Sequence, residues 1–226
     1  MTPVFFIHIP KAGGTSIRNV LQKRARDRLV QVYPGRKGRE YEDLRNRCMS
    51  DNAIIFGHFD WGLHEFVGAQ PRYAAVLRHP VERLVSWYRW MATHPHLPLH
   101  DRILAGASLP DLVEEGVTRD VSNAMVASIA GRPVRGLDDH ETLELAMSNL
   151  ERMEFVSVLE QLHRDAGRLF RHLGIDELPL PHKNPSRVPY ALCDAGHGRV
   201  IEHNGLDLAL YRRAAELASS SLADQR

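Results

Sequence analysis

The sequence predicts an α/β fold in which a central, mostly parallel sheet is flanked by helices. Short runs of β-branched and aromatic residues alternate along the chain with segments whose apolar residues recur at helical spacing. This alternation is typical of parallel sheets that carry helices on both faces. The chain has 226 residues, so we expect residues 1–226 to form one domain.

Five segments have the length and composition of buried strands. They are residues 4–9, 29–33, 53–56, 73–77 and 155–159. Helices are predicted directly after the first, fourth and fifth of these strands. Three more helices are predicted at residues 40–48, 143–153 and 206–222. Residues 93–110, rich in Pro and His, are expected to form a loop or lid with short helices.

Charge and composition restrict the class of protein. The formal net charge is +1, so no global field favours nucleic acid, and we expect no nucleic-acid partner. Cys48 and Cys193 lie far apart in the sequence, which favours a reducing compartment over a disulfide framework. The apolar run at the N-terminus is too short for a signal peptide, and no stretch is long enough to cross a bilayer. We therefore expect a cytoplasmic protein.

A glycine-rich segment follows the first strand and precedes a helix. Its two glycines allow successive backbone N–H groups to point inward, and the helix N-terminus adds partial positive charge. The segment therefore predicts a P-loop-like phosphate cradle, with an ordinary glycine turn before a capped helix as the alternative. The candidate binding residues are Lys11, Ala12, Gly13, Gly14, Thr15 and Ser16.

The position of the lysine separates this loop from the loop of nucleotide triphosphatases. In those proteins the lysine follows the glycines and stands next to a Ser or Thr that holds Mg²⁺. Here Lys11 precedes Gly13 and Gly14. The order of residues therefore does not indicate a magnesium-dependent ATPase or kinase.

A second candidate motif, residues 78–88, follows the fourth strand. Pro80 suits the first position of a helix. Arg78 leaves the strand end, and Ser86 lies two turns into the helix, off its apolar face, so both can converge on one terminal phosphate. A helix-capping arginine and a solvent-facing serine are the alternative interpretation.

Together the two motifs resemble those of a known family. Residues 6–16 are similar to the 5′-phosphosulfate loop of sulfotransferases that use 3′-phosphoadenosine-5′-phosphosulfate (PAPS), in the branch containing the heparan sulfate 2-O- and 6-O-sulfotransferases and bacterial relatives. Residues 78–88 resemble the 3′-phosphate motif of that family. Residues 182–186 and 204–211 resemble, more weakly, its late cofactor-contacting loop and its closing helix.

The resemblance implies a role for each matching position. Lys11 would contact the leaving phosphate oxygen, and the loop that follows it would cradle the 5′-phosphate. Arg78 and Ser86 would hold the 3′-phosphate, while Lys183 and Ser186 would close over the cofactor. A sulfuryl group carries less charge than a γ-phosphoryl group, so its transfer can proceed without Mg²⁺, and we expect no metal requirement.

A histidine directly after the third strand is the candidate general base. His58 follows Gly57 where the carboxyl end of a strand faces the ligand side, and neutral imidazole accepts a proton near physiological pH. A Gly-His pair supplies the base in the 2-O-sulfotransferase relatives, and Gly57-His58 looks similar. A structural histidine is the alternative, and Asp60, His64 and Glu65 are the reserve candidates.

The resemblance implies direct in-line transfer of the sulfuryl group from PAPS to an acceptor hydroxyl, with PAP as product. The acceptor would be a carbohydrate or a small metabolite, and the basic stretch at residues 24–39 could attract an anionic glycan. Two other classes stay open: an ATP-dependent small-molecule kinase, and a non-catalytic module that binds PAP or a sulfated glycan. The histidines at 94, 96 and 100 favour a lid or acceptor loop over a metal site.

Overall fold

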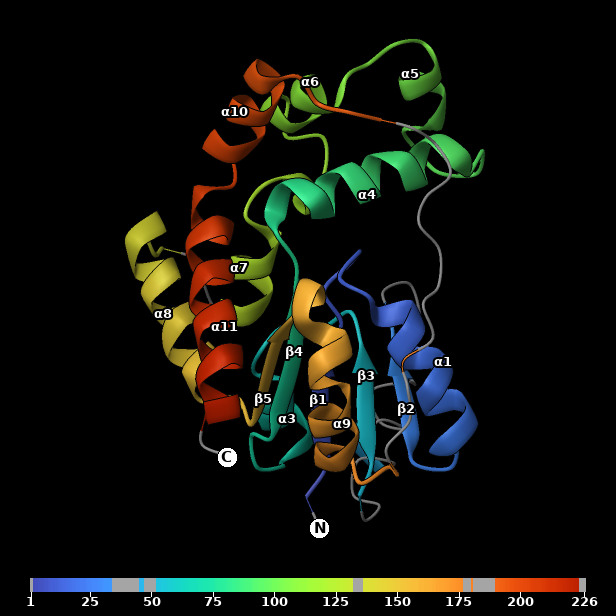
Figure 1. Ribbon diagram of the computed structural model, residues 1–226, viewed down its shortest axis with the longest axis vertical. Coiled ribbons are helices and arrows are strands. Elements are labelled where there is room, and N and C mark those ends of the chain that lie inside the picture. The colour runs from blue at the N-terminus through green and yellow to red at the C-terminus, as the bar shows by residue number, and fades with distance from the viewer. Residues whose placement is uncertain are drawn as a thin grey trace.

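A computed structural model of the protein describes residues 2–33, 45–46, 52–131, 136–176, 180 and 190–223. Five strands form one sheet in the order β2-β3-β1-β4-β5, and all neighbouring pairs are parallel (Figure 1). The strands are β1 (Val4–Ile7), β2 (Leu29–Val32), β3 (Ile54–Gly57), β4 (Tyr73–Leu77) and β5 (Phe155–Val158). The predicted α/β class and all five predicted strands are confirmed.

The first strand is shorter than predicted. It ends at Ile7, whose register partner Gly57 is the last residue of β3. Beyond that pair the chain makes one more bond, from the His8 N–H to the Gly57 carbonyl (2.8 Å), and then enters the glycine loop. The ladder with β3 therefore ends at this pair, although β4 on the other side of β1 continues to Leu77.

Ten helices and two 3₁₀ turns lie in the described part of the chain. They are α1 (Gly14–Arg24), α3 (Leu63–Val67), α4 (Pro80–Thr93), α5 (His100–Leu104), α6 (Leu109–Glu114), η1 (Arg119–Val121), α7 (Ala124–Ala130), α8 (Asp139–Glu151), η2 (Leu159–Gln161), α9 (Leu162–His172), α10 (Asp194–Glu202) and α11 (Gly205–Ala223). The helix predicted at residues 40–48 lies almost entirely outside the described residues. In the described ranges, no helix is both long enough and apolar enough to cross a lipid bilayer.

Helix α8 begins four residues before the predicted start at residue 143. Asp138 caps it: its carboxylate accepts from the Glu141 N–H (2.8 Å), and the Glu141 carboxylate accepts from the Asp138 N–H (2.9 Å). This capping box stabilises a polar first turn that apolar periodicity alone does not reveal.

Helices cover both faces of the sheet. Side chains alternate along each strand, so Phe5 and Ile7 face one side of the sheet while Val4 and Phe6 face the other. The first side packs against α3, α7, α8 and α11, and the second against α1 and α9 (Figure 1). The sheet is therefore buried between two helical layers, as the apolar strands require.

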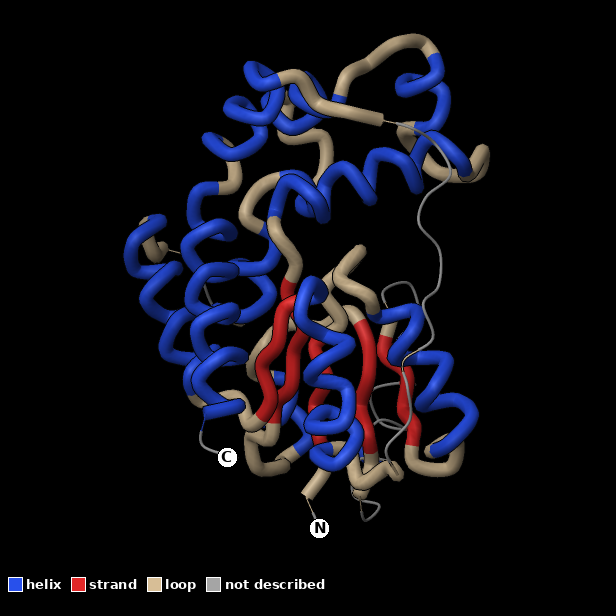
Figure 2. Tube along the Cα trace, in the orientation of Figure 1, coloured by secondary structure: helices blue, strands red, loops and turns tan. Residues whose placement is uncertain are grey.

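A third hydrophobic core lies beyond the sheet. It joins α4, α5, α6 and α10, and none of its described members belongs to a strand. Its centre is formed by Leu84, Trp87, Ile103, Leu112 and Val200. Helix α4 passes over the carboxyl ends of the strands, and the short helices lie on its far side (Figures 1 and 2). These helices form a cap over the edge of the sheet where ligands bind in α/β proteins.

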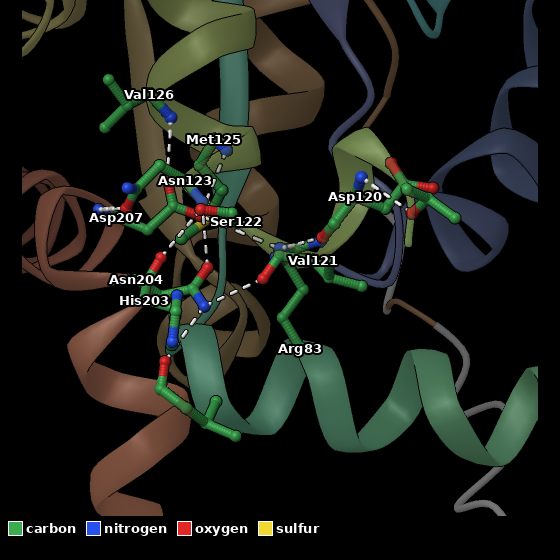
Figure 3. A network of polar contacts seen from close by, with 12 residues as sticks. Arg83, Asp120, Val121, Ser122, Asn123, Met125, Val126, His203, Asn204 and Asp207 are labelled. Atoms are coloured by element: carbon green, nitrogen blue, oxygen red, sulfur yellow. Dashed lines mark hydrogen bonds and ion pairs between the residues drawn. The ribbon is translucent and has the colours of Figure 1, made fainter. Parts of the chain in front are cut away.

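A buried ion pair ties the cap to the rest of the fold (Figure 3). Arg83 on α4 and Asp207 on α11 are both fully buried, with 3.8 Å between Nη2 and Oδ2. Asp207 also accepts from the backbone N–H groups of Val126 (2.8 Å) and Met125 (3.2 Å), in the first turn of α7. Arg83 donates to the Asp120 carbonyl (2.7 Å). One carboxylate therefore holds α4, α7 and α11 together.

Two asparagines complete this network (Figure 3). Asn123 precedes α7 in the left-handed conformation (φ 45°), and its side-chain oxygen accepts from the Asp207 N–H (3.1 Å). The Asn204 side chain accepts from the Asn123 N–H (3.0 Å) and donates to the Val121 carbonyl (3.0 Å). The two asparagines thereby satisfy buried backbone groups around the start of α7, which fixes the path of the chain there, although Nε and Nη1 of Arg83 have no partner among the described residues.

Candidate active site

The order of the strands identifies where a ligand should bind. From β1 the chain leads to β2 on one side of the sheet, and from β4 it leads to β5 on the other. The direction of winding therefore changes between the adjacent strands β1 and β4, and such a switch point opens a crevice at the carboxyl ends. The glycine loop follows β1 and the Arg78 segment follows β4, so both predicted phosphate motifs flank this point.

The glycine loop has the backbone shape of an anion cradle. Lys11 and Gly13 both have positive φ (68° and 82°), so the chain curls twice before α1 begins at Gly14. A Cβ at Gly13 would lie 2.6 Å from Leu159, and one at Gly14 would lie 1.8 Å from the His8 ring. No described side chain caps α1, so its first N–H groups are available to an anion.

Lys11 and Arg78 meet at the switch point. Arg78 donates from Nη1 to the Lys11 carbonyl (3.1 Å) and pairs with Glu82 through Nη2 (3.6 Å). Burial, reinforced by the charge of Arg78, lowers the pKa of Lys11 to about 8. Burial also lowers the pKa of Arg78, and Glu82 opposes that shift. The two predicted motifs are thus joined by a direct hydrogen bond.

Helix α4 carries the other predicted 3′-phosphate residue. Ser86 is half-buried, two turns after the Pro80 that begins the helix. One turn further, Arg89 donates to the Tyr190 carbonyl (2.8 Å), and its buried Nε has no hydrogen-bond partner among the described residues. The positive charge of Arg89 acts on Arg78. Arg89 is not among the residues predicted from the sequence, although its spacing of three residues from Ser86 places both on one helical face.

His58 stands beside the glycine loop, next to a second imidazole. Its ring stacks on that of His8 at 4.5 Å and lies edge-on to Tyr33 at 4.9 Å. The His8 ring in turn fills the space next to Gly14. The strand pairing explains this arrangement, because His8 and His58 directly follow the register partners Ile7 and Gly57.

Burial keeps both imidazoles neutral. The pKa of His58 is lowered by burial and by the charge of Arg18, against raising effects from the His8 backbone and Asp120. The pKa of His8 is lowered to about 3, chiefly by burial. Nδ1 of His58 is buried and has no hydrogen-bond partner in the described part of the chain. At neutral pH His58 is therefore in the form that accepts a proton.

The reserve candidates for the base occupy different places. Asp60 pairs with Arg119 of η1 (3.0 Å) near His58. His64 is buried and its Nδ1 lies 3.0 Å from the Tyr73 hydroxyl. Tyr73 begins β4, so His64 and its neighbour Glu65 lie toward the amino ends of the strands, away from the glycine loop. Of the three, only Asp60 lies on the ligand side.

The histidines of residues 94–100 contact nearby backbone carbonyls and one another. His94 Nδ1 lies 2.8 Å from the Trp90 carbonyl, and His100 Nδ1 lies 3.3 Å from the Met91 carbonyl. The rings of His94 and His96 are 5.8 Å apart. Among the described residues, no group of three or more His, Cys, Asp or Glu side chains is placed to hold a metal ion.

Several of the predicted residues fall outside the part of the chain that the structure describes. Lys183 and Ser186 are outside the described residues, as is the part of the basic stretch that follows residue 33. Within that stretch, Arg28 donates to the carbonyls of Leu173 (2.7 Å) and Gly174 (3.0 Å), at the end of α9. Arg28 therefore has a structural role, since it binds the carbonyls that a helix C-terminus leaves unpaired.

The comparisons with known proteins identify the family of the chain. The chain belongs to the Sulfotransferase family, whose model matches residues 2–114. That region contains the glycine loop, His58, Arg78 and Ser86. No curated protein matches the chain in sequence.

A solved structure is also similar. It is the crystal structure of mouse sulfotransferase SULT7A1 complexed with PAP, with 13% identity and a TM-score of 0.49. The similarity covers 89% of this chain and 62% of the mouse chain, so this chain spans less than two thirds of that sulfotransferase.

Proposed function

We propose that the protein transfers the sulfuryl group of PAPS to an acceptor hydroxyl. The observation that carries this proposal is the hydrogen bond from Arg78 to the Lys11 carbonyl, which joins two anion-binding motifs at the switch point of the sheet. Membership in the Sulfotransferase family supports sulfuryl transfer in general. The heparan sulfate branch, the acceptor and the mechanism are parts of the proposal.

The residues present fit a ligand with phosphates at both ends. The uncapped start of α1 and the curled loop before it suit a 5′-phosphate. Arg78, Ser86 and Arg89 supply a planar guanidinium, a hydroxyl and a second cation for a 3′-phosphate. Leu159 and His8 already occupy the space that side chains at Gly13 and Gly14 would need, so only glycine keeps the loop open.

The roles of the side chains follow from their charge states. PAPS, when bound, supplies the sulfuryl group and becomes PAP. His58, held neutral by burial, takes the proton from the acceptor hydroxyl. Protonated Lys11 and the N–H groups of the loop stabilise negative charge that develops on the leaving phosphate. The acceptor we propose is a carbohydrate hydroxyl or that of a small metabolite.

Selective binding of PAP tests the proposal. In thermal-shift titrations without metal, PAP should stabilise the protein more than ADP or AMP, because only PAP engages both the loop and the Arg78 segment. ATP with Mg²⁺ is the comparison that represents a kinase. Equal stabilisation by PAP and by ATP with Mg²⁺ would exclude the proposed cofactor. An acceptor screen with radiolabelled PAPS then distinguishes an enzyme from a module that only binds PAP.

Arg78→Ala should weaken binding of PAP about 10- to 150-fold, because a charged hydrogen bond contributes about 1.5–3 kcal/mol. Calorimetric titration measures this loss. The affinity for adenosine 5′-phosphosulfate, which has no 3′-phosphate, should fall much less than the affinity for PAP. The exposed Arg26→Ala variant is the matched control and should bind PAP as the wild type does. If Arg78→Ala weakened both nucleotides equally, Arg78 would not be the 3′-phosphate ligand.

A further inference from the structure

Trp90 faces the tip of the lysine in the glycine loop. The Lys11 ammonium lies 5.1 Å from the centroid of the indole ring, within the range of a cation–π contact. Trp90 is half-buried on α4, one turn beyond Ser86. Apolar periodicity assigns this residue to core packing, and its neighbour Trp87 is indeed buried in the cap. Trp90 also packs against the cap core, so its contact with Lys11 is an additional one.

We propose that Trp90 is a positioning residue that holds the Lys11 ammonium at the reacting end of the site. The proposal rests on the proposed function, in which Lys11 stabilises the leaving phosphate. It goes beyond that function by assigning the orientation of the lysine side chain to a residue of α4, the helix that follows Arg78.

Lys11 is held at two points, and both belong to the segment that follows β4. At the root of the side chain, the backbone is left-handed (φ 68°) and Arg78 binds the carbonyl (3.1 Å). At the tip, the Trp90 ring lies against the ammonium. A lysine side chain has four rotatable bonds between these points, and fixing its root alone would leave the ammonium free to reorient.

The surroundings of Lys11 disfavour its protonated form. Burial and the positive charge of Arg78 both lower its pKa. The positive charge of Lys11 in turn lowers the pKa of His8. The face of an indole ring attracts a cation and does not attract a neutral amine. Trp90 therefore favours the protonated form that leaving-group stabilisation requires.

The arrangement can be tested without turnover. The chain contains four lysines, so ¹³C labelling of lysine gives four Cε signals, which Lys11→Arg assigns. In the wild type, the Lys11 signal should be shifted by the indole ring current and should titrate near pH 8. In Trp90→Leu the ring-current shift should vanish, and the midpoint should fall by about 0.4–1.5 pH units. Trp90→Phe, which keeps an aromatic face, should lie between the two.

Two controls separate this effect from general disturbance. The signal of Lys23, exposed on α1, should not change in any variant. His94→Gln removes the other ring beside Trp90, 5.5 Å away, and should leave the Lys11 signal as in the wild type. If Trp90→Leu does not fold, the proposal is tested by Trp90→Phe, in which the chemical shift and the titration midpoint of Lys11 should still differ from those of the wild type. An unchanged Lys11 signal and midpoint in both Trp90 variants would overturn the proposal.

Kinetics provide the second readout. Trp90→Leu should lower kcat about 2- to 30-fold and move the alkaline limb of the kcat/KM profile to lower pH, with Trp90→Phe restoring part of both. Loss of activity with an unmoved alkaline limb would indicate a merely structural role. If the wild type transfers no sulfuryl group from PAPS, the proposed function fails, whereas the lysine titration still decides the role of Trp90.

Discussion

His58→Ala is expected to lower turnover about 10²- to 10⁴-fold, the range over which a positioned general base accelerates a reaction. PAP affinity should be nearly unchanged, because the base acts on the acceptor. His58→Asn should be no more active, since an amide does not take up the proton. Steady-state kinetics and PAP titration of the same samples measure the two effects. His140→Gln, on the exposed surface of α8, is the control for loss of a histidine and should be fully active.

The pH dependence of turnover tests the same role of His58. Burial lowers the pKa of His58 from 6.5, so the neutral form persists to lower pH than in a free imidazole. Wild-type turnover should therefore decline only as the pH falls below 6.5. That acid limb should disappear in His58→Ala. If His58→Asn kept substantial activity and the acid limb remained, Asp60 would be the next candidate for the base.

The second large effect concerns stability. Asp207→Ala should lower the free energy of unfolding by about 3–5 kcal/mol, because it leaves the Arg83 charge buried without its partner. It also removes the acceptor for the N–H groups of Met125 and Val126. Urea denaturation measures the loss. Glu216→Ala, on the exposed part of α11, should change stability by no more than about 0.5 kcal/mol.

A double variant distinguishes the buried charge from simple loss of packing. In Arg83→Met with Asp207→Leu, no charge is left unpaired, so the variant should be more stable than Asp207→Ala alone. If the free energy of unfolding of Asp207→Ala lay within about 1 kcal/mol of the wild-type value, the network would contribute little to the stability of α7 and α4.

The sequence was most informative where the signal is local. Each predicted strand is a short apolar run ended by Gly, Pro or a polar residue, and parallel strands end at the same edge of a sheet. The sequence alone therefore assigns Lys11, His58 and Arg78 to one edge, and they lie there. Their chemical roles stay predictions. The start of α8 was placed too late, because its polar first turn depends on a capping box.

Contacts between distant segments could not be predicted. Asp207 caps α7 from 81 residues away, and nothing in the apolar pattern of either helix indicates this pairing. The stacking of His8 on His58 depends on the register of two strands. The contact of Trp90 with Lys11 is likewise hidden, because an aromatic residue at helical spacing is usually part of a core. In each case the partner is chosen by tertiary structure, which a single sequence does not contain.

The separate hydrophobic core of the cap bears on how such a protein can diversify. The two cores that enclose the sheet fix the glycine loop, whereas the described residues of the cap core come from helices and loops and from no strand. Helix α4 belongs to both parts: its start carries the Arg78 segment, and its apolar face lies in the cap. Mutations in α5, α6 and α10 can therefore accumulate without altering the sheet. Under the proposed function, descendants of one ancestral chain would acquire new acceptors in this way while the residues proposed to bind PAPS are inherited intact.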